Sequence, residues 1–195
     1  MSGNPVSYFY IIEVKQTILE PEKLIRKCIL NNRKAQHQLF DRYSDRLYLV
    51  AIRYLKNRFA AEEATGNAFL KIFQSLDRFR YDGEIKFVAW MRRIVVNEAL
   101  MEIRRMKQLP LFTNEFPEII SSSESGENMY YDELVHLIDR LPEGYRLVFK
   151  LYVIEGYNHA EISDLLQISE GTSKSQLHKA RLQIQQLLIK SENYE

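Results

Sequence analysis

Apolar residues recur at spacings of three and four along most of the chain, from about residue 31 to residue 108 and again from about residue 131 almost to the end. This spacing predicts helices, because it places the apolar side chains on one face of each. Between the two stretches, prolines, a glycine and a serine cluster give the composition of a linker. We therefore expect an all-α protein with two small helical domains, at residues 20–108 and 130–190, joined by a flexible linker at residues 109–129.

Three long helices are predicted in the first domain. The apolar stripe of the first consists of Leu39, Tyr43, Leu47, Val50 and Tyr54. The stripe of the second consists of Ala61, Ala64, Ala68, Ile72 and Leu76. The third segment is apolar around most of its circumference as far as Val96 and then becomes basic at Arg104 and Arg105. Its first half is thus expected to be buried and its end exposed, so that this domain forms a helical bundle.

Aromatic and basic residues alternate in the segment DRFRYDGEIKF, between the second and third helices. The residues concerned are Phe79, Arg80, Tyr81 and Phe87, with Gly83 for the turn. Such a loop suits stacking on unpaired bases together with contacts to the nucleic-acid backbone. The alternative is that these rings only close the core, which is the commoner role for any single ring.

The second domain has a sequence of start and stop signals. Pro142 is well placed at a helix start, and Gly156 is able to end that helix. A short helix follows at residues 160–166, then a turn at residues 167–169, and Ser169 is expected to cap a longer helix. Short helix, turn and longer helix is the helix-turn-helix arrangement, whose second helix enters the major groove of DNA.

The longer helix divides into an apolar and a polar face. Its inward face consists of Ser173, Leu177, Ala180, Ile184 and Leu187. Its outward face consists of Lys174, Ser175, Gln176, His178, Lys179 and Arg181. Lysine and arginine neutralise phosphates, while serine, glutamine and histidine bond to base edges. A charged face that only meets solvent has a similar composition.

Composition narrows the class of protein. The chain is 46% hydrophobic and 27% charged, with only 7 Gly and 5 Pro, which favours a helical globular protein over a sheet with many tight turns. The single cysteine, Cys28, excludes an internal disulfide and a cysteine-based metal site, and we expect it to be a small buried hydrophobe. No basic leader or membrane-length apolar run occurs in the sequence, so we expect a cytoplasmic protein.

At the level of whole segments the chain resembles a known family. The stretch LPEGYRLVFKLYVIEGYNHAEISDLLQISEGTSKSQLHKAR is similar to the C-terminal DNA-binding region of the extracytoplasmic-function sigma factors of bacterial RNA polymerase, which are small members of the sigma-70 family. The stretches AQHQLFDRYSDRLYLVAIRYLKN, AEEATGNAFLKIFQSLDRFR and IKFVAWMRRIVVNEALMEIRRMKQ resemble, in order, helices of the family's N-terminal domain. Two ordered matches on either side of a tether are more specific than a lone helix-turn-helix.

The resemblance implies a protein that binds core RNA polymerase, brings it to a promoter and helps to open the duplex. The helix-turn-helix would read the minus-35 element through the six outward residues. The N-terminal domain would read and melt the minus-10 element, using an aromatic loop to capture an extruded base. The residues implied for that role are Phe79, Arg80, Tyr81, Trp90, Arg92, Arg93, Asn97, Arg104 and Arg105.

The resemblance also implies protein partners: the largest polymerase subunit and the flap of the second-largest subunit. The largest subunit would be bound through outward positions of the second helix, namely Glu62, Glu63, Gly66, Asn67 and Lys71. The family commonly has a membrane-bound anti-sigma factor that masks these surfaces, and such a protein is a candidate partner here. No cofactor, metal or small-molecule substrate is implied.

The sequence departs from the family pattern at five positions. Gly66 stands where a glutamine is usual, Asn67 where an acid is usual and Met101 where an aspartate is common. Gln176 replaces a common arginine, and Gln167 replaces the usual turn glycine. At Gln167 we expect either an altered turn or a tolerated left-handed conformation.

Three alternatives remain beside a promoter-specific initiation factor. Gly66 and Asn67 motivate the first, a sigma-like regulator that binds DNA or polymerase but has weakened core binding. The second is an enzyme that uses glutamates or histidines as metal ligands or acid-base groups. The spacing of these residues argues against it: the adjacent Glu62 and Glu63 diverge around a helix, and the three histidines lie on separate segments, at His136, His159 and His178. The third, a generic helix-turn-helix repressor, leaves the first domain unexplained and has no evident dimer seam.

Overall fold

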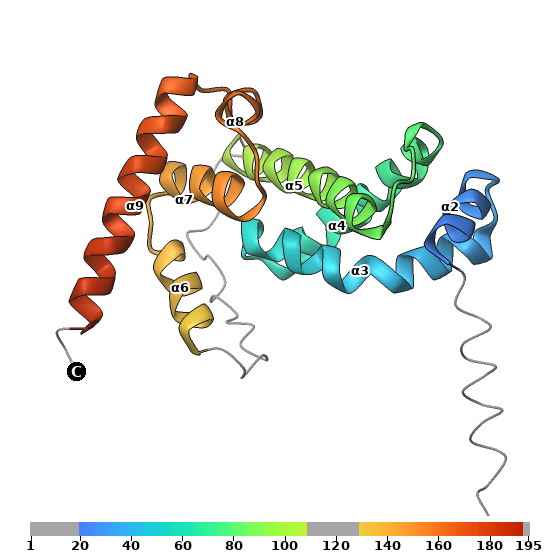
Figure 1. Cartoon of the computed structure of the whole chain (residues 1–195), viewed down its shortest axis with the longest axis horizontal. Helices are drawn as coiled ribbons and strands as arrows, with labels where there is room; N and C mark the ends of the chain where they lie inside the picture. The colour runs from blue at the N-terminus through green and yellow to red at the C-terminus, as the bar shows by residue number, and fades with distance from the viewer. Residues whose placement is uncertain (1–19, 109–128, 193–195) are drawn as a thin grey trace, which may run out of the picture. The chain divides into compact units, whose positions relative to one another are not determined.

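The computed structural model describes residues 20–108 and 129–192, and every regular element within these ranges is helical (Figure 1). The prediction of an all-α protein is therefore confirmed. The chain divides into two compact units, Met1–Thr113 and Asn114–Glu195.

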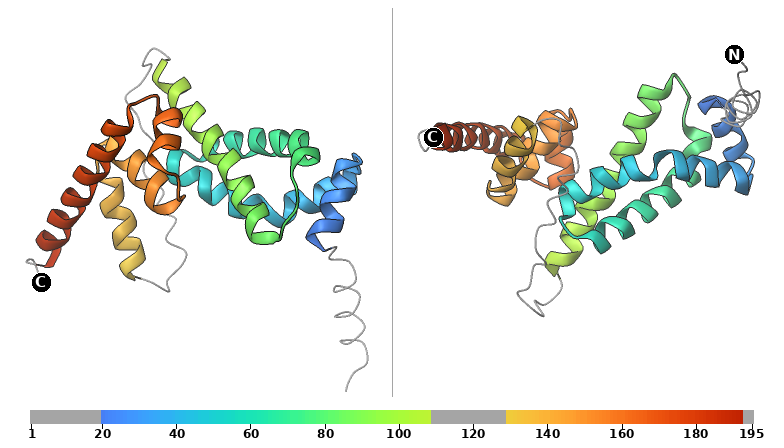
Figure 2. Two further views of the ribbon diagram at one scale, coloured as in Figure 1. Left: turned by 45° about the horizontal axis from the view of Figure 1, so that its top comes forward. Right: turned by 90° about the horizontal axis from the view of Figure 1, so that it is seen from below.

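The described part of the first unit, residues 20–108, contains four α-helices and one short 3-10 helix. They are α2 (Pro21–Ile29), α3 (Arg33–Leu55), α4 (Arg58–Ser75), η1 (Leu76–Arg78) and α5 (Glu84–Gln108). The three long helices α3, α4 and α5 each pack against the other two, while α2 packs against α3 and η1 (Figure 2).

The core of the first unit forms where the apolar stripes of these helices meet. Both predicted stripes, on α3 and on α4, are buried along their whole length. The largest fully buried side chains of the unit are Leu39, Leu47, Ile72, Leu76, Phe87, Met91, Val95 and Val96. Arg104 and Arg105 near the end of α5 are exposed, so the predicted change from a buried to an exposed helix is observed.

Cys28 lies in α2 with only 3% of its surface exposed. Burial raises the pKa of its thiol to about 11, because the apolar surroundings disfavour the thiolate. The prediction of a small buried hydrophobe is confirmed.

Asparagine side chains start both α3 and α4. The Asn32 carboxamide oxygen accepts a hydrogen bond from the Ala35 backbone N–H at 3.0 Å, and that of Asn57 accepts one from the Ala60 N–H at 2.9 Å. Each bond satisfies a donor that the first turn of a helix leaves unpaired. Only two residues, one of them Lys56 in the left-handed region (φ 54°), join α3 to α4.

Within residues 129–192, the second unit contains four α-helices and a short π-helical stretch. They are α6 (Met129–Asp139), α7 (Glu143–Phe149), the π-helical η2 (Lys150–Ile154), α8 (His159–Leu166) and α9 (Glu170–Glu192). The long helix α9 contacts α6, α7 and α8. Its buried contacts include Ala180 and Ile184, which form a cluster with Ile138 and Leu141.

The start and end signals of the second unit act largely where they were predicted. Pro142 is the residue that precedes the first turn of α7. The chain does not leave the helix at Phe149 but widens into η2, and Gly156 then takes a positive φ of 76° that ends it. Gly156 therefore has the predicted role, at the end of a composite helix.

A buried ion pair fixes this composite helix against the end of α6. Lys150 Nζ lies 3.0 Å from Asp139 Oδ1, and only 4% of the lysine side chain is exposed. Arg146 Nη1 donates to the backbone carbonyls of Asp139 and Leu141, at 3.0 and 3.2 Å. These contacts hold the end of α6 against the composite helix.

Substitution of Gly66 by alanine is expected to stabilise the first unit by about 1 kcal/mol, because glycine is disfavoured in a helix interior by about that amount. A Cβ atom at position 66 meets nothing within 4 Å. Hydrogen exchange of the α4 amides measures the change. Gly83→Ala is the matched control and should destabilise, because Gly83 has a φ of 89° that L-residues rarely adopt. Faster exchange in Gly66→Ala would contradict the prediction.

Candidate nucleic-acid interface

The helix-turn-helix of the second unit is closed by hydrogen bonds within its turn. Gln167 adopts a left-handed conformation (φ 55°, ψ 47°), so of the two expectations the tolerated left-handed turn is the one observed. Its side-chain amide donates to the Asp164 carbonyl at 2.7 Å. The Ser163 hydroxyl donates to the Ile168 carbonyl at 2.8 Å, and the Ile168 N–H donates to the Ser163 carbonyl at 3.1 Å. These bonds offset the cost of a left-handed residue that is not glycine.

Both helices of the motif have side-chain caps. As predicted, Ser169 caps α9, with its hydroxyl accepting from the Thr172 N–H at 3.0 Å. The cap of α8 was not predicted: the Asn158 side chain accepts from the Glu161 N–H, and the Glu161 carboxylate accepts from the Asn158 N–H, each at 2.9 Å. This capping box is visible in the sequence as N-x-x-E before an apolar residue.

Helix α9 presents an exposed basic stripe. Lys174, His178 and Arg181 are exposed and lie at spacings of four and three, which places them on one face. Ser175 and Lys179 are exposed beside them. The opposite face is buried through Ser173, Leu177, Ala180 and Ile184, with Leu187 partly buried. The stripe begins at the N-terminal end of α9, where a recognition helix presents side chains to bases.

Gln176 differs from the other five outward residues. Its side chain is only partly exposed and lies against α7, where a Cβ added to Gly144 would come within 3.1 Å of Nε2. Its Oε1 atom is buried and has no hydrogen-bond partner among the described residues. The expectation that Gln176 faces outward is therefore corrected, because the small Gly144 leaves room for its side chain inside the unit.

Sequence reasoning missed an aromatic contact beside the stripe. Arg181 Cζ lies 5.9 Å from the centroid of the Tyr152 ring, and that ring stacks on His159 with centroids 4.7 Å apart. His159 Nδ1 lies 2.8 Å from the Ser173 hydroxyl. The participants are spread over η2, α8 and α9, so no local pattern in the sequence reveals the contact.

In the first unit, the loop before α5 contributes to an aromatic cluster. Phe79 stacks on Trp90 with centroids 4.6 Å apart, and both rings contact Phe87, which is fully buried. Tyr81 meets Phe87 edge-on. Phe87 therefore closes the core, whereas Phe79, Tyr81 and Trp90 are each partly exposed, and the neighbouring Arg80 is exposed.

Glu84 anchors this cluster to α3. Its Oε1 atom accepts from the Tyr43 hydroxyl at 3.0 Å and lies 3.1 Å from Arg42 Nη2. Burial, followed by the hydrogen bond to Glu84, raises the pKa of Tyr43 above its usual range, so the phenol keeps its proton and remains a donor. These contacts of Glu84 hold the first turn of α5 against α3, next to the aromatic cluster.

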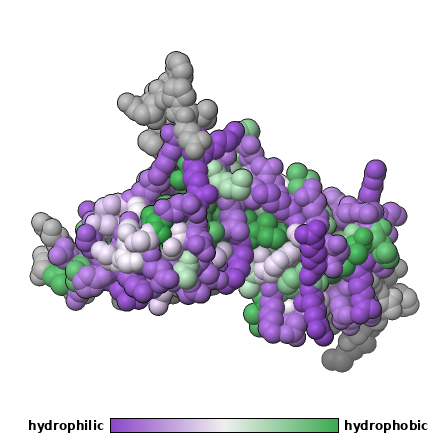
Figure 3. Space-filling view, turned by 90° about the horizontal axis from the view of Figure 1, so that it is seen from above, coloured by the Kyte–Doolittle hydropathy of each residue, from purple (hydrophilic) through white to green (hydrophobic). Residues whose placement is uncertain are grey.

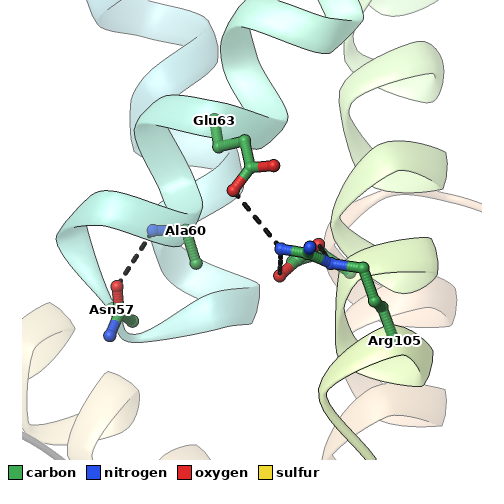
Figure 4. Close-up of polar contacts among 5 residues, drawn as sticks. Asn57, Ala60, Glu63 and Arg105 are labelled. Carbon is green, nitrogen blue, oxygen red and sulfur yellow. Dashed lines mark hydrogen bonds and ion pairs between the residues drawn. The ribbon is translucent and has the colours of Figure 1, made fainter. Parts of the chain in front are cut away.

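The polar site residues predicted along α5 differ in exposure and in the direction of their side chains. Arg93, Asn97 and Arg104 are exposed, at spacings of four and seven that place them on one side of the helix, and Arg92 is partly exposed. Arg105 instead reaches toward α4 (Figure 4): its Nη2 atom lies 3.4 Å from Glu63 Oε2.

Arg105 is held more closely by a carboxylate on its own helix. Its Nε and Nη2 atoms donate to the two oxygens of Glu102 at 2.7 and 2.8 Å. The hydrogen bond to Glu102, together with the nearby charges of Glu102 and Glu63, raises the pKa of Arg105. Arg105 is thus a cation already matched by two carboxylates in this conformation.

The five predicted outward positions of α4 are all exposed, and their charged members have partners within the unit. Glu62 pairs with Arg58 at 3.0 Å, and Glu63 with Arg105. Lys71 lies 2.6 Å from Glu98 of α5, a carboxylate that is 8% exposed. Gly66 and Asn67 lie between these pairs without adding charge.

Two apolar side chains on α4 were not among the predicted site residues. Phe59 is 75% and Leu70 61% exposed, and the spacing of Phe59, Glu63, Gly66 and Leu70 places them along one face. The surface of the protein in Figure 3 is largely hydrophilic and carries separate apolar patches. The sequence could have revealed these two exposed side chains, because a helical-wheel projection of α4 places Phe59 and Leu70 outside the buried alanine stripe.

Among the described residues, no group of three or more His, Cys, Asp or Glu side chains could hold a metal ion. None of the described helices is long and apolar enough to cross a membrane.

Two family descriptions match the chain, one in each unit. Sigma-70 region 2 matches residues 39–108, and Sigma-70, region 4 matches residues 131–184. The first match ends at the last residue of α5, and the second includes α8, the turn and α9 as far as Ile184.

Curated relatives agree with these matches. The chain is 29% identical over 163 residues to the ECF RNA polymerase sigma factor SigE of Mycolicibacterium smegmatis, covering 78% of this chain and 61% of that protein. It is 29% identical over 178 residues to SigW of Bacillus subtilis, covering 82% and 94% of the two chains. It is 25% identical over 177 residues to the ECF RNA polymerase sigma-E factor of Escherichia coli K12, covering 84% and 91%.

Among solved structures, the sigma factor RpoE of Bartonella quintana, in complex with the anti-sigma factor NepR, matches at 18% identity and a TM-score of 0.49, covering 78% of this chain and 95% of that one. The two region matches and the named relatives carry the assignment. The chain belongs to the sigma-70 family, among its extracytoplasmic-function sigma factors.

Proposed function

We propose that this sigma factor reads the minus-35 element with α9 and the minus-10 element with the loop and outer face of α5. As a sigma factor it acts in promoter-directed transcription initiation, with core RNA polymerase and promoter DNA as partners. In domain terms, residues 20–108 are the minus-10 and polymerase-binding part, residues 109–129 the linker and residues 130–190 the minus-35 part. The linker lies almost wholly outside the described residues.

The observation that carries the proposal is the exposed stripe of Lys174, His178 and Arg181 on a helix that follows a tightly bonded turn. A major groove admits one helix, and side chains on a single face of it contact bases and phosphates together. Ser175 and Lys179 extend the stripe. Gln176 would act from behind this surface, through its contact with α7.

In the first unit we propose that Phe79, Tyr81 and Trp90 stack on an unpaired base while Phe87 supports them from the core. Half-exposed rings in contact with a buried one make a rigid platform, and base stacking on aromatic side chains is worth roughly 1–3 kcal/mol per base. Arg80, Arg92, Arg93, Asn97 and Arg104 would contact the DNA around it. Arg105 would join them only after exchanging its carboxylate partners for phosphate.

Polymerase binding is assigned to the exposed face of α4, with Glu62, Glu63, Gly66, Asn67 and Lys71. Phe59 and Leu70, on the same helix, supply apolar contact area, which the acidic residues do not provide. We further infer that the protein is not an enzyme and that it acts in the cytoplasm, with an anti-sigma factor as a candidate regulator of these surfaces.

Run-off transcription tests the initiation role. The purified chain with core polymerase is expected to select a subset of promoters from the source genome, because it has both promoter-reading surfaces. Start sites are mapped by sequencing the transcripts, with core polymerase alone as the control. If core binding is intact and no promoter is selected, the initiation role is wrong.

Lys174→Ala is expected to weaken promoter binding by the holoenzyme whatever the sequence at the contacted position, and to reduce the slope of log K against log salt by about one, because one phosphate contact is lost. Lys23→Ala is the control, since Lys23 is an exposed lysine of α2 outside the proposed surfaces. Binding isotherms at several salt concentrations give the slopes. An unchanged slope in Lys174→Ala would contradict a phosphate contact.

The second candidate function, a sigma-like regulator with weakened core binding, is favoured by Gly66 and Asn67. The variant Gly66→Gln/Asn67→Glu restores the amide and the carboxylate that the family pattern has, and is expected to bind core polymerase more tightly than the unaltered chain. Gly66→Ala separates the effect of a stiffer helix from that of the polar groups. A pull-down in which the unaltered chain already binds core polymerase tightly would exclude the regulator.

A further inference from the structure

We propose that Tyr152 is a positioning residue for DNA binding, which holds Arg181 on the exposed stripe of α9. The inference rests on the proposed function, in which Arg181 contacts DNA. It adds a residue from η2 to a surface that otherwise comes from α9 alone.

The contact has the geometry of a cation–π interaction. Arg181 Cζ lies 5.9 Å from the centroid of the Tyr152 ring, within the range over which a guanidinium is attracted to the face of an aromatic ring. Tyr152 is 37% exposed and Arg181 is exposed, so both lie at the surface where DNA would arrive. The Tyr152 ring that Arg181 contacts is neutral, so this contact does not neutralise the charge that a phosphate would attract.

Tyr152 is itself held from behind. Its ring stacks on His159, at 4.7 Å between centroids and 24° between planes. His159 Nδ1 is 2.8 Å from the hydroxyl of Ser173, a fully buried residue on the inward face of α9. The path leaves α9 at Ser173, passes through α8 and η2 and returns to α9 at Arg181.

This closed path explains how an exposed arginine is restricted before DNA binds. A free arginine side chain loses much rotamer freedom when it binds, and a side chain already confined near its bound position loses less. Tyr152 therefore contributes to affinity through Arg181 rather than through a contact of its own. Its loss should matter only while Arg181 is present.

A double-mutant cycle measures that dependence. The full chain and its variants are titrated at low salt into a fluorescently labelled duplex of random sequence, because a phosphate contact acts on any sequence. Tyr152→Leu is expected to lower the affinity about two- to fivefold, the loss that corresponds to an exposed cation–π contact. Tyr152→Phe keeps the ring and should bind as the unaltered chain does.

The decisive comparison is made in the background of Arg181→Ala. That variant should bind more weakly than the unaltered chain, and Tyr152→Leu/Arg181→Ala should be no weaker than Arg181→Ala alone, because coupled residues do not give additive losses. Val153→Ala changes an exposed neighbour of Tyr152 and should leave the affinity unchanged. Thermal unfolding of each variant shows whether a loss of binding is a loss of folding.

Four results would overturn the inference. Two come from the variants of Tyr152: additive losses in the double variant, or a Tyr152→Phe variant as weak as Tyr152→Leu. The other two are an Arg181→Ala variant that binds like the unaltered chain, and an unaltered chain that binds no duplex. Run-off transcription is scored separately, so a protein that selects promoters while the cycle shows additivity loses only the role of Tyr152.

Discussion

Burial of one apolar stripe on each long helix is the constraint on which the rest of the structure depends. In the first unit the stripes of α3 and α4 meet α5, and Leu39, Ile72 and Val95 are fully buried where they join. Once these stripes are buried, the remaining faces of the helices contact either solvent or a partner molecule. The surfaces that we propose for polymerase and for DNA are therefore consequences of how the core is packed.

Polar contacts then decide which charges on those faces are committed to the fold. Lys71 reaches the nearly buried Glu98, and Arg105 is matched by Glu102 and Glu63, so these cations link helices or neutralise neighbouring acids. Lys174 forms an exposed pair with Glu170 at 3.4 Å, and pairs of that kind contribute little to stability. The same residue type thus has different roles in the two units.

The second unit achieves its short turn without glycine. Gln167 occupies a left-handed conformation because its own amide and the Ser163 hydroxyl bond to the backbone around it. A rigid turn fixes the direction in which α9 leaves α8, and the buried Ser173 ties the start of α9 to His159. Specific side-chain hydrogen bonds therefore stabilise a turn that would otherwise favour glycine, at the point where α9 begins.

By itself the sequence determined the helices, the buried stripes, the Ser169 cap and the basic stripe on α9, because these depend on spacing within one helix. The resemblance of whole segments also indicated the family. Tertiary structure alone decided that Gln176 lies against Gly144, that Arg105 turns toward Glu63, and that Tyr152 lies between His159 and Arg181. Those contacts join residues on different elements, and the approach of one helix to another is set by the packing of the whole core rather than by any local pattern.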